Sequence, residues 1–429
     1  MSVLARTVLM VLLLVPWAAA DDAPHFLREV DWKPLNALGV QHSGRVVPFA
    51  IYADAYVHDL HGRSGMTDGA GWRVPAPLVL LEAIFDPERA IEWCRVPAGD
   101  LPGLGVQERL GTLPAGEALE YLAFGNRSAE LDTKATQELA VLEARLALLV
   151  FAIEEVRLLP DEQGGIEWLT LAQFSDPDLN ELIDRFAIAW RVGDAPTVNQ
   201  AMADLARALS IRQSDAGVHE GILRLELLLT SLHLLSIAVV LYALACGLAL
   251  LWSSCRRLIV GLLCSALAVH LLAVIARAVV MDRLPIQNHY ESMIAAAAMV
   301  GGAALLYGRR KDGQTIHAVG AGIAACLIAA AEWLELPGRV LELEAGILSS
   351  TAILKYHVLT ILAGYALIML GAGIGGAVLV RRARGASLDQ LSGLHRLQVN
   401  LGYSVFWVLG IGILLGAIWA DRAWGRWWA

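Results

Sequence analysis

The spacing of apolar and polar residues divides the chain near residue 225. From Asp21 to about Leu225, apolar and polar positions are mixed and the segment leans acidic. Beyond that point, long apolar runs are separated by short charged segments. A bilayer core about 30 Å thick needs about 20 apolar residues per helix, and the second half supplies such runs repeatedly. The pattern predicts an all-α polytopic membrane protein, with a soluble domain (residues 21–225) followed by a transmembrane helix bundle (residues 226–429).

The apolar runs of the second half predict six membrane-spanning helices. We place them at Leu227–Trp252, Leu258–Met281, His289–Tyr307, Thr315–Trp333, Tyr356–Val380 and Leu401–Ala420.

The soluble domain is predicted to be rich in helix. Frequent Pro and Gly residues up to about residue 110 indicate short helices and extended links. Beyond Pro114, apolar residues recur three and four positions apart, which is the spacing of one helical face. This spacing predicts helices at Leu131–Leu158, Asp176–Trp190 and Pro196–Ile211.

Residues 1–20 have the pattern of a secretory signal peptide. Arg6 supplies a positive charge, Val8–Val15 is a short apolar stretch, and Ala18–Ala20 forms a small-residue cleavage site. The apolar stretch is short for a membrane span, which favours cleavage over a retained anchor. Under either alternative, the domain that follows is exported.

Basic residues in the short loops predict the orientation of the spans. Arg256 and Arg257, Arg309–Lys311 and Arg381–Arg384 fall in the first, third and fifth loops between spans, whereas the second and fourth loops are acidic or mixed. Lys and Arg in short loops are retained on the cytoplasmic side. We therefore expect a protein of the bacterial cytoplasmic membrane whose N-terminal domain and C-terminal end face the periplasm.

Composition excludes several classes of protein. With 57% hydrophobic residues, the chain is too apolar for one soluble globule. A net charge of −9 without a basic cluster argues against nucleic-acid binding. The five cysteines are isolated and form no Cys-x-x-Cys pair, so thiol–disulfide exchange and covalent haem attachment to this chain have no support.

Two histidines, His233 and His270, fall inside the first two predicted spans. An ionisable group in a span needs a partner and is a functional candidate. A neutral imidazole could hydrogen-bond a neighbouring helix or ligate a metal or haem, and the first alternative is favoured.

Three polar or aromatic features are predicted to meet at the outer face. These are the segment Pro285–Ser292, the imidazole of His357, and the indoles of Trp419, Trp424, Trp427 and Trp428. Such a density of tryptophan exceeds what an aromatic belt needs. A porphyrin could stack on these rings while an imidazole ligates its iron. The residues alone leave a second interpretation open, in which the tryptophans anchor the chain and His357 makes a hydrogen bond.

Several motifs resemble the CcsA/ResC-type cytochrome c assembly proteins, which handle haem in system II cytochrome c maturation. The motifs are Pro285–Ser292 (similar to Pro-x-x-Asn-x-Tyr-Glu-Ser), Tyr356–Val358 with Gly364 and Tyr365, Leu388–Tyr403, Gly416–Ala420, and Trp424–Trp428, which resembles the opening of the tryptophan-rich signature. Val40–Pro48 is similar to an exported extension found in some longer members.

The resemblance implies a role for each of these residues. His357 would be an axial ligand to the iron of haem b, which is held transiently as a substrate. Trp419, Trp424, Trp427 and Trp428 would form a stacking platform. Asn288, Tyr290 and Glu291 would be structural or line the cavity. The partners implied are a ResB-type membrane protein and apocytochrome c, and the chain would be a component of a cytochrome c synthase with no catalytic side chain of its own.

The sequence departs from the family pattern at its C-terminus. In the family, the signature continues into further spans that carry a second outer-face histidine, whereas this sequence ends at Ala429. The expectation is a split gene whose second chain completes the bundle, a truncated sequence, or a degenerate relative. Two functions of other classes stay open: a non-catalytic membrane scaffold or receptor, and, ranked last, a small-solute transporter, for which no inverted repeat is visible.

Overall fold

The computed structural model describes residues 22–42, 44–63, 65–97, 111–124, 133–160, 168–173, 176–252, 255–309, 312–334 and 352–425. The chain divides into two compact units between Leu227 and Leu228, and each is described by itself. The predicted signal peptide (residues 1–20) lies outside the described residues.

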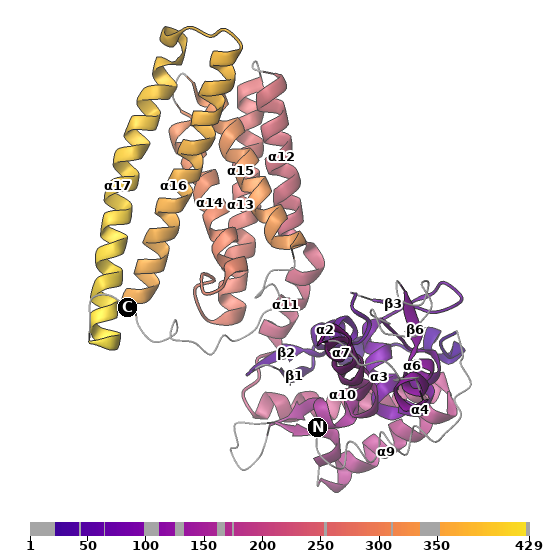
Figure 1. Ribbon diagram of the computed structural model, residues 1–429. Helices are drawn as coiled ribbons and strands as arrows, with labels where there is room; N and C mark the ends of the chain where they lie inside the picture. Colours follow the sequence, from indigo (N-terminus) through magenta and orange to yellow (C-terminus); the bar gives the residue numbers. More distant parts are fainter. Residues whose placement is uncertain are drawn as a thin grey trace. The chain divides into compact units, whose positions relative to one another are not determined.

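Helices form most of the first unit (Figure 1). They are α2 (Phe49–His61), α3 (Ala76–Phe85), α4 (Pro87–Trp93), α6 (Ala115–Phe124), α7 (Thr133–Val150), α8 (Ala152–Glu155), α9 (Pro177–Val192) and α10 (Ala195–Asp215), with 3-10 turns η1 (His25–Arg28), η2 (Lys33–Leu35) and η3 (Leu171–Gln173). All ten residues of α3 are buried, so this helix lies at the centre of one continuous apolar core. The three predicted helices correspond to α7 with α8, α9 and α10.

Short antiparallel strands accompany these helices. Strands β1 (Gly39–His42), β2 (Arg45–Pro48), β7 (Arg157–Leu159) and β8 (Leu169–Thr170) form one sheet in the order β2-β1-β7-β8, while β3 (Met66–Thr67) pairs with β4 (Arg73–Val74) and β5 (Arg95–Pro97) with β6 (Thr112–Pro114). Sequence patterning predicted only extended links before residue 110. Strands of two to four residues are too short to show the alternation by which strands are recognised.

A buried polar network joins three helices of this unit. The fully buried Glu82 carboxylate accepts hydrogen bonds from Arg89 Nε at 2.5 Å and from Trp190 Nε1 at 2.7 Å. Burial raises the pKa of Glu82, while the hydrogen bonds from Arg89 act in the opposite direction. The network therefore fixes α3, α4 and α9 together while satisfying a carboxylate in the core.

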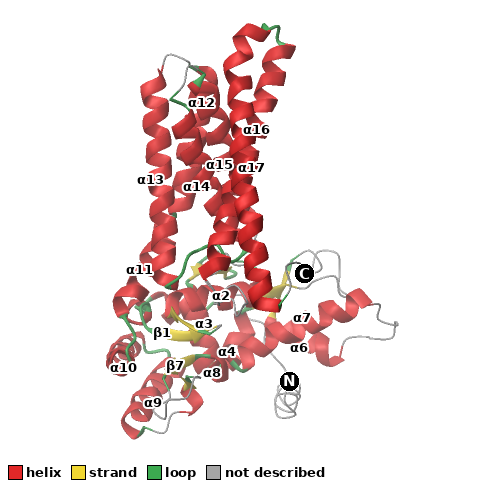
Figure 2. Ribbon diagram, turned by 90° about the vertical axis from the view of Figure 1, so that its left-hand side faces the viewer, coloured by secondary structure: helices red, strands yellow, loops and turns green. Residues whose placement is uncertain are grey.

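The second unit is an antiparallel bundle of long apolar helices (Figures 1 and 2). Its members are α12 (Leu234–Leu251), α13 (Arg256–Met281), α14 (His289–Tyr307), α15 (Gly313–Trp333), α16 (Ala352–Ala383) and α17 (Leu388–Trp424), and α11 (Glu220–Leu232) precedes them. Among the described residues, six helical segments are long and apolar enough to cross a membrane, with α11 and α12 taken together as Glu220–Leu251. The predicted fold class is confirmed.

Close helix packing in the bundle depends on small residues. A Cβ atom placed on Gly320 of α15 would lie 2.2 Å from Ala304 Cβ on α14. Helices α16 and α17 pack against each other along their length, and α16 also contacts α14 and α15 (Figure 1). Backbones approach closely where glycine and alanine remove side-chain bulk, which supports association in lipid.

Two of the predicted spans differ in their limits. The span predicted at Leu227–Trp252 is broken at His233, which has a left-handed backbone (φ +46°) and an exposed side chain. The span predicted at Leu401–Ala420 is only part of α17, whose 37 residues extend about 55 Å. Helix α17 begins at a capping box, in which Ser387 and Gln390 each satisfy the backbone N–H of the other.

Candidate haem-handling site

Alternation of the helices brings the predicted site residues to one end of the bundle. Helices α13, α15 and α17 end there, and α14 and α16 begin there, at the lower end of the bundle in Figure 1. We call this end, which carries Tyr290, His357, Trp419 and Trp424, the tryptophan end. The opposite end, with Arg256, Arg309 and Arg381–Arg384, is called the arginine end.

His357 lies one turn into α16 and faces α17. Its Nδ1 is 2.8 Å from the backbone oxygen of Gly412, and its ring is half-buried. A carbonyl oxygen only accepts hydrogen bonds, so Nδ1 is the protonated nitrogen of the neutral ring. Its Nε2 has no hydrogen-bond partner in the described part of the chain. The lone pair of Nε2 is therefore available to a ligand.

Two glycines of α17 lie against this imidazole. A Cβ atom on Gly416 would lie 2.6 Å from His357 Cε1 and 2.8 Å from Nδ1, and one on Gly412 would lie 2.7 Å from Ile361 Cδ1. The edge of the imidazole thus occupies the space that a Cβ atom of residue 416 would fill. The sequence showed the glycines, but their role depends on how α16 and α17 pair.

The indoles of Trp419 and Trp424 lie together near the end of α17. Their ring centroids are 4.7 Å apart with planes inclined at 71°. Trp419 Nε1 is buried without a hydrogen-bond partner among the described residues, and the Trp424 side chain is 45% exposed. Trp427 and Trp428 lie outside the described residues. The tryptophan end therefore combines an imidazole, an accessible aromatic surface and an orphaned buried N–H.

Two side chains of the polar motif at the start of α14, Asn288 and Tyr290, make hydrogen bonds that stabilise the fold. Asn288 Oδ1 accepts the backbone N–H of Glu291 at 2.8 Å and caps the helix. Tyr290 donates its hydroxyl to Glu332 Oε1 of α15 at 2.5 Å. The Asn288 bond stabilises the first turn of α14 and the Tyr290 bond joins α14 to α15, so these side chains hold the start of α14 in place.

Glu291 is the centre of an ion-pair cluster. Its buried carboxylate accepts from Arg277 Nε at 3.1 Å, Arg283 Nη1 at 2.8 Å and the Gln287 backbone N–H at 2.9 Å. The Arg277 guanidinium also lies 5.0 Å from the centre of the Tyr290 ring. Sequence reasoning missed both arginines as partners. The available signal was Arg277 itself, a charge inside a predicted span that needs a counter-ion.

The other intramembrane histidine lies away from this cluster. His270 is fully buried midway along α13, with its ring centroid 6.0 Å from that of Tyr242 in an edge-to-face arrangement. By strict geometry neither ring nitrogen has a hydrogen-bond partner among the residues that the structure describes, although the ring lies near the Ile294 backbone of α14. This approach to α14 is consistent with the favoured interpretation, an interhelical hydrogen bond, which stays a prediction.

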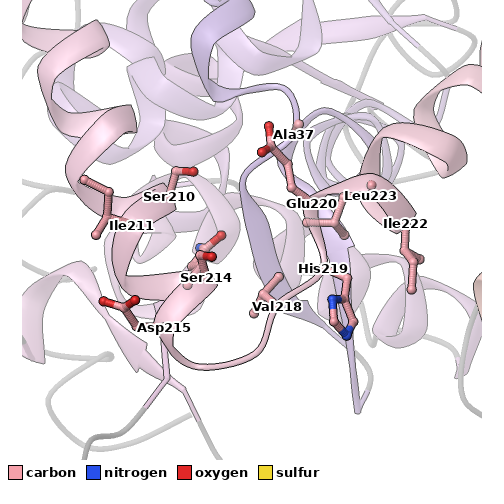
Figure 3. Close-up of a pocket in the computed structure, with 12 residues that line it drawn as sticks. Ala37, Ser210, Ile211, Ser214, Asp215, Val218, His219, Glu220, Ile222 and Leu223 are labelled. Atoms are coloured by element: carbon pink, nitrogen blue, oxygen red, sulfur yellow. The ribbon is translucent and has the colours of Figure 1, made fainter.

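A hollow in the first unit lies between the end of α10 and the start of α11. Figure 3 shows Ser210, Ser214, Asp215, His219 and Glu220 around it. The Glu220 carboxylate is engaged by Arg224 at 2.6 Å. Within the described ranges, no group of three or more His, Cys, Asp or Glu side chains is placed to hold a metal ion. The tryptophan end remains the stronger candidate site.

Comparison with known proteins agrees with the motifs at that end. Residues 286–429 match the family described as Cytochrome C assembly protein. The chain is 30% identical over 174 residues to Protein NrfI of Wolinella succinogenes, covering 38% of this chain and 18% of that protein. It is 29% identical over 182 residues to Cytochrome c biogenesis protein CcsA of Prochlorococcus marinus, covering 34% of this chain and 56% of that protein. The match to CcsA of a Synechococcus strain is 29% over 107 residues, 25% of this chain and 29% of that protein. The chain therefore spans well under two thirds of each of these relatives.

Proposed function

We propose that this chain presents haem at the outer membrane face for attachment to apocytochrome c, and the match of residues 286–429 to the cytochrome c assembly family supports this proposal. The family match and the relatives named CcsA support a role in cytochrome c biogenesis. The haem-presenting role rests on the tryptophan end.

The observation that carries the proposal is the state of His357. Its Nδ1 is engaged by a backbone carbonyl, which leaves Nε2 as a lone-pair donor at a half-buried position. Ligating histidines commonly use the second nitrogen in this way, because the hydrogen bond fixes tautomer and ring orientation. Imidazole is also a common axial ligand of haem iron. The donor chemistry of the site therefore fits haem.

The indoles supply a complementary surface. Trp419 and Trp424 form an aromatic pair whose outer member is accessible, and Trp427 and Trp428 follow three and four residues after Trp424 in the sequence. We assign these four rings to contact with the porphyrin face, and Trp419 Nε1 to donation toward a polar group of the bound haem.

The chain's own residues would bind and orient haem, with no side chain of the chain reacting. Each reduced apocytochrome thiol would add across a haem vinyl group, so that a C–S bond forms and the thiol hydrogen goes to the neighbouring vinyl carbon. Haem b would therefore be a substrate held transiently by His357. A ResB-type membrane protein and apocytochrome c are the proposed partners.

The test is the absorption spectrum of haem that copurifies with the full chain and its ResB-type partner. We expect His357→Ala to abolish the parent haem spectrum and to lower haem content at least tenfold. His395→Ala removes an exposed imidazole from the same helix pair at the arginine end and serves as the matched control. An unchanged spectrum in His357→Ala, or an equal loss in both variants, would contradict the assignment.

A further inference from the structure

We propose that Gly412 and Gly416 of α17 form a positioning device for His357, in which one glycine supplies the carbonyl that fixes the imidazole tautomer and the other supplies the space for the ring. The inference rests on the proposed function and extends it to two residues that have no side chain with which to ligate.

The first component is space. The edge of the His357 ring fills the place where a side chain at position 416 would begin, because Cε1, Nδ1 and Nε2 lie 2.6, 2.8 and 3.3 Å from an ideal Cβ. A Cβ atom essentially never approaches another heavy atom this closely, so any residue other than glycine must displace the ring. The ring belongs to a side chain with two rotatable bonds, and a displacement would reorient Nε2.

The second component is the hydrogen bond. Gly412 lies one helical turn before Gly416, and its carbonyl accepts from His357 Nδ1 at 2.8 Å. In an α-helix each carbonyl also accepts an intrahelical bond, and its second lone pair serves an outside donor. A Cβ atom at position 412 would lie 2.7 Å from Ile361 Cδ1 and 3.5 Å from the Ile361 backbone nitrogen, so the Ile361 side chain would have to turn away. The absence of a side chain at position 412 thus allows the close approach of α16 in which the hydrogen bond forms.

The third component is the shared helical face. Residues spaced four and three apart lie on one side of a helix, so Gly412, Gly416 and Trp419 all face α16. Trp419 lies about 5 Å along the axis from Gly416. The arrangement therefore holds the imidazole of His357 and the indole of Trp419 on one surface at a fixed separation.

The decisive experiment is a double-mutant cycle between positions 416 and 357 in the full chain, measured first without haem. Gly416→Ala is expected to lower the unfolding temperature of the parent but to leave that of the His357→Ala variant unchanged, because the clash disappears with the ring. Gly410→Ala is the matched control, since its added Cβ meets no atom within 4 Å. Equal effects of Gly416→Ala in both backgrounds would overturn the proposal.

The second measurement uses the haem spectrum. Gly416→Ala is expected to lower haem content at least tenfold and to give the spectrum of His357→Ala, and added imidazole should restore the parent spectrum in His357→Ala. Gly410→Ala should keep the parent spectrum. If His357→Ala alters the spectrum and Gly416→Ala does not, the positioning role is wrong and the proposed function stands. If neither alters it, the proposed function fails, and the haem-free cycle still decides whether position 416 controls the ring.

Discussion

At the scale of single residues, His61 links the stability of the first unit to pH. Its ring is buried, and Nδ1 donates to the Arg95 carbonyl at 2.8 Å. Burial lowers the pKa of His61, and the guanidinium groups of Arg63, Arg95 and Arg145 lower it further, against the effect of the hydrogen bond. At pH values below the ordinary histidine pKa, the unfolded chain therefore binds more protons than the folded one. Stability is present above that pH and is lost as the pH falls.

His61→Asn should weaken this pH dependence. Asparagine can place an amide donor near the position of Nδ1 but does not ionise between pH 5 and 7.5. We expect amide hydrogen exchange in α2, corrected for its intrinsic pH dependence, to rise more steeply on acidification in the parent than in the variant. An equal rise in both would show that another group controls the acid response.

Single residues also show where sequence reasoning stops. His357 and the tryptophans were recognisable because their chemistry is visible in the residue type. Gly412 and Gly416 carry no chemistry that a sequence displays, since their function depends on α16 and α17 lying side by side. The same is true of Arg283, whose pairing with Glu291 depends on the turn that follows α13.

At the scale of secondary-structure elements, hydropathy predicted the spans but not their interruptions. Leucines continue through the junction at His233, so the break between α11 and α12 leaves no mark on the apolar pattern. The start of α17 was missed for the opposite reason. Its first turns carry Asp389, Gln390, His395 and Arg396, which lower the local hydropathy, although the Ser387–Gln390 capping box identifies the start.

The first two turns of α11, up to Leu227, belong to the first unit, and a buried ion pair holds them there. Glu226 is 1% exposed, and its Oε2 accepts from Arg45 Nη1 of β2 at 3.1 Å. Removing one partner of a buried pair costs about 3–5 kcal/mol, because the other charge is left without compensation. We expect Glu226→Gln to accelerate amide exchange in β1, β2 and α11. Glu220→Gln on the same helix, which breaks only the exposed pair with Arg224, should leave exchange in β1 and β2 unchanged.

The start of α14 is predicted to be a structural element. Glu291→Gln would leave Arg277 and Arg283 facing each other with less compensating charge. The unfolding temperature of the full chain should fall, while haem bound per folded molecule should keep the parent spectrum. Asp421→Asn changes an exposed carboxylate at the same end and should alter neither quantity. A changed haem spectrum in Glu291→Gln would instead indicate that this carboxylate lines the haem site.

At the scale of the whole molecule, the orientation of the bundle decides whether the proposed chemistry is accessible. The arginine end carries Arg256, Arg257, Arg309 and Arg381–Arg384, and basic residues in short loops are retained in the cytoplasm. The tryptophan end would then face the periplasm, where apocytochrome thiols meet haem. Aromatic side chains occur at both membrane interfaces, so the tryptophans themselves do not determine this direction.

Labelling of single cysteines tests the orientation, in a chain whose five native cysteines are replaced by serine or alanine. Leu284→Cys introduces a thiol at an exposed position of the tryptophan end, and Arg384→Cys introduces one at the arginine end. A membrane-impermeant maleimide should label Leu284→Cys on intact spheroplasts and Arg384→Cys only after permeabilisation. Both positions lie in short connections next to helix ends. Labelling in permeabilised cells measures how accessible each thiol is when no membrane blocks the reagent, and the labelling of intact spheroplasts is compared with that value. The reverse pattern would place His357 and the indoles on the cytoplasmic side, where the haem they hold could not meet an exported apocytochrome.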